Sequence, residues 1–213
     1  MRKKNKAKII ISSIIILLPI LAGIILWDRL PDVLAIHWGV NGKPDGWTNK
    51  ATAVTAFPLL LLFVHLVCIF ITSKDPKNQN ISSKLLGLVL GICPAISVFI
   101  SFIVYSTALG KAYSLTVFIP VMLGLMFIII GNYMPKCKQS RTLGIKIKWT
   151  LENEENWNAT HRFSGKLWVA GGFVNFIFIF FPDSYCIILS FIYTMILVFI
   201  PVIYSYNYHI KHK

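Results

Sequence analysis

The sequence has few charged residues: 14% of its 213 residues are Asp, Glu, Lys or Arg, whereas 56% are apolar. A soluble globular domain carries about 25% charged residues, so this composition excludes an ordinary soluble domain. The chain is too apolar to be intrinsically disordered, and its four cysteines are too few for a disulfide scaffold. Several stretches of about 20 residues contain no charge, and that is the length an α-helix needs to cross a bilayer.

Six apolar stretches are long enough to be membrane-spanning helices. They lie at about residues 9–27, 53–73, 85–106, 112–131, 166–182 and 185–205. We therefore expect an all-α integral membrane protein, folded as a six-helix transmembrane bundle. The fifth stretch is the weakest, because it is the shortest and contains Gly171, Gly172 and Asn175.

The spans divide the chain into three segments. Residues 1–52 comprise the first span and an ordered loop, and residues 53–131 comprise the second to fourth spans. Residues 132–213 comprise a long polar loop and the last two spans.

Lys and Arg are concentrated in alternate loops. Residues 1–8, 74–84, 132–166 and 206–213 hold 17 of the 21 basic residues, and the intervening loops hold four. Positively charged short loops are retained in the cytoplasm, so we expect both termini on the cytoplasmic side. The net charge of +13 is then mostly a topology signal that also favours anionic lipid headgroups. No basic domain or motif predicts direct binding to nucleic acid.

The spans lack carboxylates, since all eight Asp and Glu residues fall in loops or at span edges. A proton- or sodium-coupled carrier usually needs ionisable groups at membrane depth, so this absence argues against such a carrier. Only His65 could titrate within a span. A neutral imidazole that is hydrogen-bonded to a neighbouring helix is the simpler interpretation of this residue.

The loop between the first two spans has the residues of an ordered structure. Lys43-Pro44-Asp45-Gly46 matches a β-turn, and Asn41-Gly42 favours a second tight turn just before it. Tryptophan rings prefer the headgroup zone, so we expect the loop to form a small cap on the membrane. A lone histidine is a weak metal signal, and we expect no metal or other cofactor. The candidate ligand-binding residues are His37, Trp38, Asp45 and Trp47.

The long loop after the fourth span contains a cluster of polar and aromatic residues. We expect a helix from about Asn153 to Phe163, which would place Trp157 and His161 on one face. The candidate catalytic residues are Glu154, His161 and Arg162, which resemble an acid–base cluster. No nucleophile motif or paired metal-ligand spacing accompanies them. We therefore favour a structural plug with Glu–Arg and Glu–His contacts over a catalytic site.

Two sets of residues resemble a known family. His37-Trp38-Gly39, Pro44-Asp45-Gly46-Trp47 and Lys50 resemble the short domain of unknown function that opens many SdpI-like bacterial membrane proteins. The second set is similar to the signature of the SdpI family itself and comprises Asn132, Tyr133, Pro135, Trp149, Thr150, Asn153, Glu154, Asn156, Trp157, Thr160, His161 and Arg162. The sequence departs from the family pattern at Ile147-Lys148, where a Thr-Pro is usual, and at Ser140, where an Asn is usual.

The resemblance implies a multi-pass protein of the bacterial cell membrane that protects a bacterium against a secreted, membrane-active peptide toxin. It also implies a relay in which a transcriptional repressor is held at the membrane. The expected partners are the lipid bilayer, a peptide toxin and a cytoplasmic repressor. Two alternatives stay open at this point: a membrane-embedded enzyme that uses Glu154, His161 and Arg162, and a small transporter.

Overall fold

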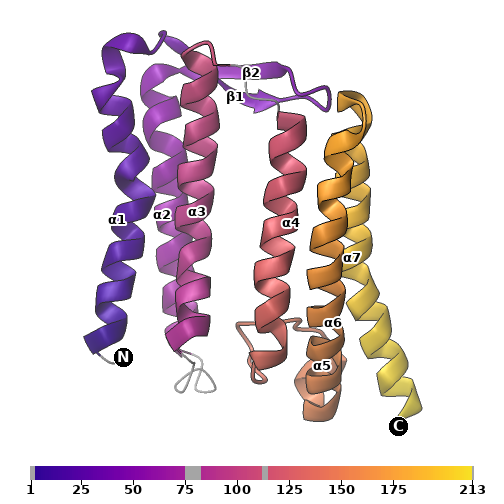
Figure 1. Cartoon of the computed structure of the whole chain (residues 1–213). Helices are drawn as coiled ribbons and strands as arrows, with labels where there is room; N and C mark the ends of the chain where they lie inside the picture. The colour runs from indigo at the N-terminus through magenta and orange to yellow at the C-terminus, as the bar shows by residue number, and fades with distance from the viewer. Residues whose placement is uncertain (1–2, 75–82, 112–114, 213) are drawn as a thin grey trace. The chain divides into compact units, whose positions relative to one another are not determined.

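A computed structural model describes residues 3–74, 83–111 and 115–212 (Figure 1). The elements in chain order are α1 (Lys3–Ile25), η1 (Trp27–Arg29), β1 (Val33–Trp38), β2 (Pro44–Asn49), α2 (Lys50–Lys74), α3 (Ser83–Ala108), α4 (Leu115–Tyr133), η3 (Met134–Lys136), α5 (Lys148–Glu152), α6 (Glu154–Asn175), η4 (Phe176–Phe180) and α7 (Asp183–Lys211). The first residues of the fourth predicted span, 112–114, and most of the basic loop at 74–84 lie outside the described residues.

Six helical segments of the described chain are long and apolar enough to cross a membrane: α1, α2, α3, α4, α6 with η4, and α7. They also carry large apolar side chains that the protein leaves uncovered, such as Phe63 on α2 and Phe191 on α7. Such side chains are suited to contact lipid. The prediction of an all-α membrane protein with six spanning helices is confirmed. Its orientation stays a prediction.

The chain divides into two compact units. The first comprises Met1–Gly39 and Lys43–Tyr113, and the second comprises Val40–Gly42 and Ser114–Lys213. Each unit therefore contains three of the spanning helices, α1 to α3 in the first and α4, α6 and α7 in the second.

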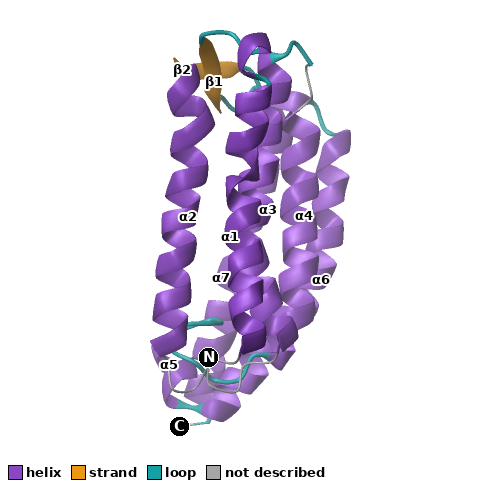
Figure 2. Ribbon diagram, turned by 90° about the vertical axis from the view of Figure 1, so that its left-hand side faces the viewer, coloured by secondary structure: helices purple, strands orange, loops and turns teal. Residues whose placement is uncertain are grey.

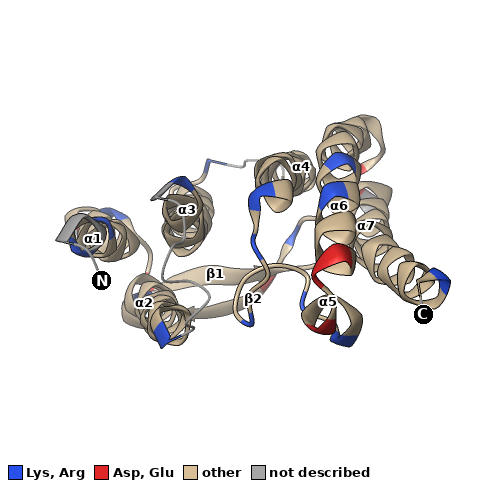
Figure 3. Cartoon of the chain, turned by 90° about the horizontal axis from the view of Figure 1, so that it is seen from below, with Lys and Arg blue, Asp and Glu red and all other residues tan. Residues whose placement is uncertain are grey.

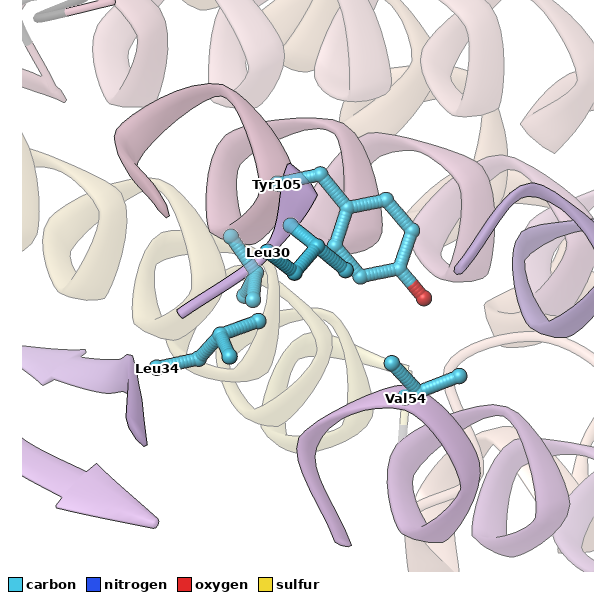
Figure 4. Close-up of a cluster of buried hydrophobic side chains, with 5 residues drawn as sticks. Leu30, Leu34, Val54 and Tyr105 are labelled. Carbon is cyan, nitrogen blue, oxygen red and sulfur yellow. The ribbon is translucent and has the colours of Figure 1, made fainter. Parts of the chain in front are cut away.

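The first unit has its hydrophobic core at the helix ends that carry the hairpin β1–β2 (Figure 1). The core comprises Leu30, Leu34, Val54, Val104 and Tyr105, and Figure 4 shows four of them converging from the loop, the hairpin, α2 and α3. Tyr105 packs with its ring in this core and donates its hydroxyl hydrogen to the Pro19 carbonyl, at 2.9 Å. The hairpin is thus built into the core of this unit and is held by it.

His65 lies buried in the same unit, on α2. Its Nε2 lies 2.9 Å from the hydroxyl of Ser12 on α1. Ser12 also donates to the Ile9 carbonyl, at 2.9 Å, so its oxygen is left to accept from His65. The hydrogen bond to a neighbouring helix that we expected for His65 is therefore present.

In the second unit, glycines bring α4 and α6 into close contact (Figure 2). A Cβ atom on Gly124 would lie 2.6 Å from the Gly172 carbonyl oxygen, and one on Gly165 would lie 2.8 Å from the Gly131 carbonyl oxygen. The two pairs are seven residues apart on both helices, so a single face of each helix makes both contacts. Gly172 makes the fifth span harder to recognise in the sequence, but in the structure it allows α6 to pack against α4.

Two prolines in this unit each release a backbone carbonyl, because a proline lacks the N–H that would bond four residues back. Pro120 releases the Thr116 carbonyl, which accepts from the Cys186 thiol at 2.8 Å. Pro201 releases the Leu197 carbonyl, which accepts from the indole N–H of Trp168 at 2.9 Å. Side chains from a neighbouring helix thus replace both lost hydrogen bonds.

The fifth span differs from our expectation, which was a short helix at 153–163 followed by a span at 166–182. α6 is one continuous helix from Glu154 to Asn175, and it is followed directly by η4. The Asn153 side chain caps its start by accepting from the Asn156 backbone N–H at 2.8 Å. Neither proline nor a break separates the two predicted pieces, and Lys166 extends to the exposed surface.

The predicted orientation has a direct test. A cysteine at position 111 should react with an impermeant thiol reagent in whole cells, because the loop after α3 is predicted to face outward. A cysteine at position 154 should react only after the membrane is permeabilised. Both positions are exposed in the structure, so burial does not complicate the comparison. The unaltered protein gives the background from its own cysteines, and labelling of Glu154→Cys in intact cells would overturn the orientation.

Candidate functional site

The loop between α1 and α2 is an antiparallel β-hairpin. β1 pairs with β2 from Val33 opposite Asn49 to Trp38 opposite Pro44, with irregular register near His37. The Gly39 N–H donates to the Lys43 carbonyl at 2.9 Å and closes the loop between the strands. Gly42 adopts φ +72°, which favours glycine. The expected β-turn at 43–46 is wrong, because Pro44 to Gly46 already belong to β2.

Four exposed residues of the two strands form what we call the hairpin surface: Val33, His37, Asp45 and Trp47. Nδ1 of His37 contacts a carboxylate oxygen of Asp45 across the two strands. Trp47 is 59% exposed and Val33 is 54% exposed, so the hairpin also exposes apolar area. Gly46 makes room for His37, since a Cβ there would lie 2.9 Å from the Cβ of His37.

Trp38 lies elsewhere. It is only half-exposed and packs against the core of the first unit. Of the four candidate ligand-binding residues, the structure brings His37 and Asp45 into contact and leaves Trp47 exposed. It gives Trp38 a role in holding the hairpin.

Lys50 fixes the base of the hairpin where β2 meets α2. Its ammonium group donates to the carbonyls of Trp27, at 3.1 Å, and Leu30, at 3.0 Å. It also lies 3.4 Å from a carboxylate oxygen of Asp32, whose carbonyl accepts from the Lys50 backbone N–H at 2.8 Å. One residue thus satisfies carbonyls of the connection from α1 and anchors both ends of the hairpin.

The second set of candidate residues lies in and around the signature loop, which we define as residues 134–153. Trp157 of α6 is fully buried, and its indole N–H donates to the Cys137 carbonyl at 2.8 Å. Its ring stacks on that of His161, with centroids 4.0 Å apart. Burial raises the pKa of the Cys137 thiol, which is therefore neutral at neutral pH.

His161 uses both ring nitrogens to bind backbone groups. Nδ1 lies 2.8 Å from the Trp157 carbonyl, which can only accept, so Nδ1 carries the proton. Nε2 accepts from the Ile145 N–H at 3.0 Å, so this imidazole is neutral. Gly144 permits the contact, because it has φ +106° and a Cβ there would lie 2.5 Å from Nε2. Neither nitrogen is available to act as a general acid or base.

Thr150 and Gln139 satisfy further backbone groups of the signature loop. The buried Thr150 hydroxyl lies 2.7 Å from the Ile145 carbonyl and accepts from the Ile147 N–H at 3.1 Å. The Gln139 amide donates to the carbonyls of Thr150, at 2.9 Å, and Leu151, at 3.0 Å, at the end of α5. These contacts give the loop a defined path.

Asn156 joins α6 to α7. Its amide donates to the Ser205 carbonyl at 3.0 Å, and its oxygen accepts from the hydroxyls of Ser205, at 2.7 Å, and Thr160, at 2.9 Å. The Asn156 and Thr160 side chains are buried, so these bonds have no competition from water.

Other signature residues make packing contacts around this network. Trp149 of α5 lies with its ring centroid 5.0 Å from that of Tyr206 on α7. Pro135 lies against Gly165, 2.8 Å from where a Cβ would stand. Lys136 places its ammonium 4.8 Å from the centroid of the Tyr133 ring. Asn132 is exposed.

The candidate acid–base cluster is not assembled. Glu154 and Arg162 are both exposed on α6, whereas His161 is buried. The salt bridges found within the described ranges join neither residue to a partner. The expected Glu–His and Glu–Arg contacts are therefore wrong, and the plug is made by hydrogen bonds from side chains to the backbone. Periodicity could not reveal this, because those bonds depend on the path of the signature loop.

The charges of the signature loop lie on its exposed side. Figure 3 shows Lys and Arg residues along this end of the second unit, with Asp and Glu gathered near α5 and the start of α6. The exposed basic residues of the loop and of α6 are Lys136, Lys138, Arg141, Lys146, Lys148, Arg162 and Lys166. A buried polar network thus supports a charged outer surface.

Together these features define a multi-pass membrane protein with an anchored hairpin and a hydrogen-bonded polar loop. Residues 136–205 match the SdpI/YfhL protein family, and residues 14–62 match the domain of unknown function DUF1648. The chain is 29% identical over 213 residues to the immunity protein SdpI of Bacillus subtilis (strain 168), with 98% of this chain and 97% of that protein covered. No solved structure matches the chain significantly. Over nearly its whole length the chain is thus similar to an SdpI immunity protein, and its six candidate spans are those of a multi-pass protein of the bacterial membrane.

The Asn156 network predicts a difference between two neighbouring asparagines. Asn156→Ala removes three hydrogen bonds and leaves the Ser205 and Thr160 groups without their partner, so it should cost about 2 to 4 kcal/mol of stability. Asn158→Ala, at an exposed position of the same helix, should cost less than about 0.5 kcal/mol. Thermal unfolding of both purified variants measures this difference. Equal losses in the two variants would show that the network does not stabilise the unit.

Proposed function

We propose that this chain is a membrane immunity protein that protects a bacterium against a secreted, membrane-active peptide toxin, and that the toxin contacts the hairpin surface. The observation that carries the proposal is the exposed Trp47 on a hairpin anchored by Lys50 and packed into a hydrophobic core. The relative in Bacillus subtilis is named an immunity protein, which supports the same function.

The hairpin surface has the chemistry to recognise an amphipathic peptide. Trp47 and Val33 offer apolar area, and the His37–Asp45 pair offers hydrogen-bonding groups and charge on the same hairpin. Membrane-active peptides present an apolar face and a polar face at the bilayer interface. A rigid hairpin binds such a peptide at a lower entropic cost than a flexible loop would, because little ordering accompanies binding.

The signature loop supports a second role, which is the relay of toxin binding to a cytoplasmic repressor. Its inward side chains are used to hold the backbone, and its outward side chains are charged. In the predicted orientation this charged surface faces the cytoplasm, where it is suited to bind a protein of complementary charge. The enzyme alternative has less support, because both nitrogens of His161 are already bound.

Substitution of Trp47 tests the proposal. Trp47→Ala should cost about 2 kcal/mol of toxin binding, which is roughly a thirtyfold loss of affinity, because a large apolar contact is removed. Trp47→Phe should keep most of the protection, since it keeps an aromatic ring. Survival of a sensitive bacterium that expresses each variant is measured against a series of membrane-active peptides, with protein abundance measured by blot.

Trp38→Ala serves as the structural control. This substitution should lower protein abundance, because Trp38 packs against the core of the first unit. Trp47→Ala should leave abundance unchanged. Full protection by Trp47→Ala at normal abundance would contradict the assignment of the toxin contact to the hairpin.

A further inference from the structure

Three buried polar side chains in the second unit have no hydrogen-bond partner among the described residues. They are Asn175, at the end of α6, and Ser190 and Thr194, on α7. Asn175 and Ser190 are fully buried, and Thr194 is 9% exposed. The unpaired atoms are both polar atoms of the amide and the two hydroxyl oxygens. Buried polar groups are nearly always hydrogen-bonded, so this concentration of unpaired atoms indicates a missing partner.

Asn175 is directed between α4 and α7. It lies one helical turn after Gly171, whose Cβ position is 2.5 Å from Leu197 of α7. It also lies three residues after Gly172, which packs on Gly124 of α4. Residues separated by three or four positions share a helix face, so the Asn175 side chain lies in the interior of the three-helix unit.

Ser190 and Thr194 lie on the α7 face that is turned toward α4. They are one turn apart, and Cys186, one turn before Ser190, donates to the Thr116 carbonyl of α4 at 2.8 Å. These three residues therefore form one row along α7.

Asn175 also lies at about the height of Ser190 and Thr194 in the unit. Trp168 of α6 is hydrogen-bonded to Leu197 of α7, and the two helices run antiparallel. Asn175 is seven residues after Trp168, and Ser190 is seven residues before Leu197. Equal steps in opposite directions place Asn175 level with Ser190, and the closeness of Gly171 to Leu197 places it nearer Thr194. Asn175 therefore lies within about one helical turn of both residues.

The donor and acceptor properties of the unpaired atoms indicate which kind of ligand fits between them. The Asn175 amide nitrogen can only donate, its oxygen can only accept, and the two hydroxyls can do both. A metal cation would pair with the oxygens but would leave the amide nitrogen facing a positive charge. An anion would find no cationic side chain among these three residues. A water molecule both donates and accepts, and it is small enough for an interior site.

We infer that Asn175, Ser190 and Thr194 form an internal water-binding site between α6 and α7, within the membrane-spanning part of the second unit. The water supplies the hydrogen bonds that these side chains lack in the protein alone. It lies where α6 ends and the 3-10 helix η4 begins, and it links that end of α6 to α7. This site is independent of the toxin contact proposed for the hairpin.

Asn156 provides a matched control within the same helix. It is 1% exposed and Asn175 is 0% exposed, but the Asn156 amide donates to the Ser205 carbonyl and its oxygen accepts from Ser205 and Thr160. The experiment is water-edited solid-state NMR of the full-length protein, labelled with ¹⁵N on asparagine, in lipid bilayers. The two side-chain amide signals are assigned from the signals lost in Asn175→Ala and Asn156→Ala.

Magnetisation from water should reach the Asn175 amide several-fold faster than it reaches the Asn156 amide. Equally slow transfer to both amides would overturn the inference and would show that Asn175 bonds directly to its neighbours. Ser190→Ala and Thr194→Val remove one hydroxyl each with little change of volume, so both variants should fold. The transfer to Asn175 should weaken in each of them, and unchanged transfer in both would overturn the assignment of the site to these residues.

Discussion

The structure depends on one constraint, which is that a backbone carbonyl or N–H inside a bilayer has no water to bind. Each proline inside a spanning helix leaves one backbone carbonyl without a hydrogen bond, because it removes a donor from its own helix. In the second unit the carbonyls released by Pro120 and Pro201 accept from Cys186 and Trp168 on neighbouring helices. The same bonds that satisfy the backbone therefore also fix how the helices pack. The glycine contacts between α4 and α6 bring the backbones close enough for this arrangement.

In the signature loop, too, side chains supply the hydrogen bonds that backbone groups need. His161, Trp157, Thr150 and Gln139 all bind backbone groups of a segment that has little regular structure of its own. Their polar atoms are used to hold the chain in place, which leaves few of them for chemistry. The charges of the loop and the residues of the hairpin surface are exposed on the outside of the protein.

Much of the fold could be predicted from the sequence, because a spanning helix needs about 20 apolar residues and that length is visible in one dimension. The hairpin could not be predicted in the same way. Pro44 to Gly46 are turn-forming residues, and only the pairing of His37 with Gly46 and of Trp38 with Pro44 places them in a strand. The contacts of the candidate site residues could not be predicted either. His161 is a central residue, as expected, yet its partners are backbone groups of Ile145 and Trp157 and not the Glu154 carboxylate. The packing of Gly172 on α4 and the unpaired amide of Asn175 likewise depend on the neighbouring helices, so the sequence alone could not reveal them.

A double-mutant cycle between Trp168 and Pro201 tests most directly whether side chains replace hydrogen bonds that prolines remove. Trp168→Phe keeps an aromatic ring but loses the N–H that binds the Leu197 carbonyl, so it should cost about 1 to 3 kcal/mol of stability. Pro201→Ala restores a backbone N–H for that carbonyl. In the Pro201→Ala background, Trp168→Phe should therefore cost at least about 1 kcal/mol less, measured by reversible unfolding in detergent micelles. An equal cost in both backgrounds would contradict the account, because the indole would then stabilise the unit independently of the proline.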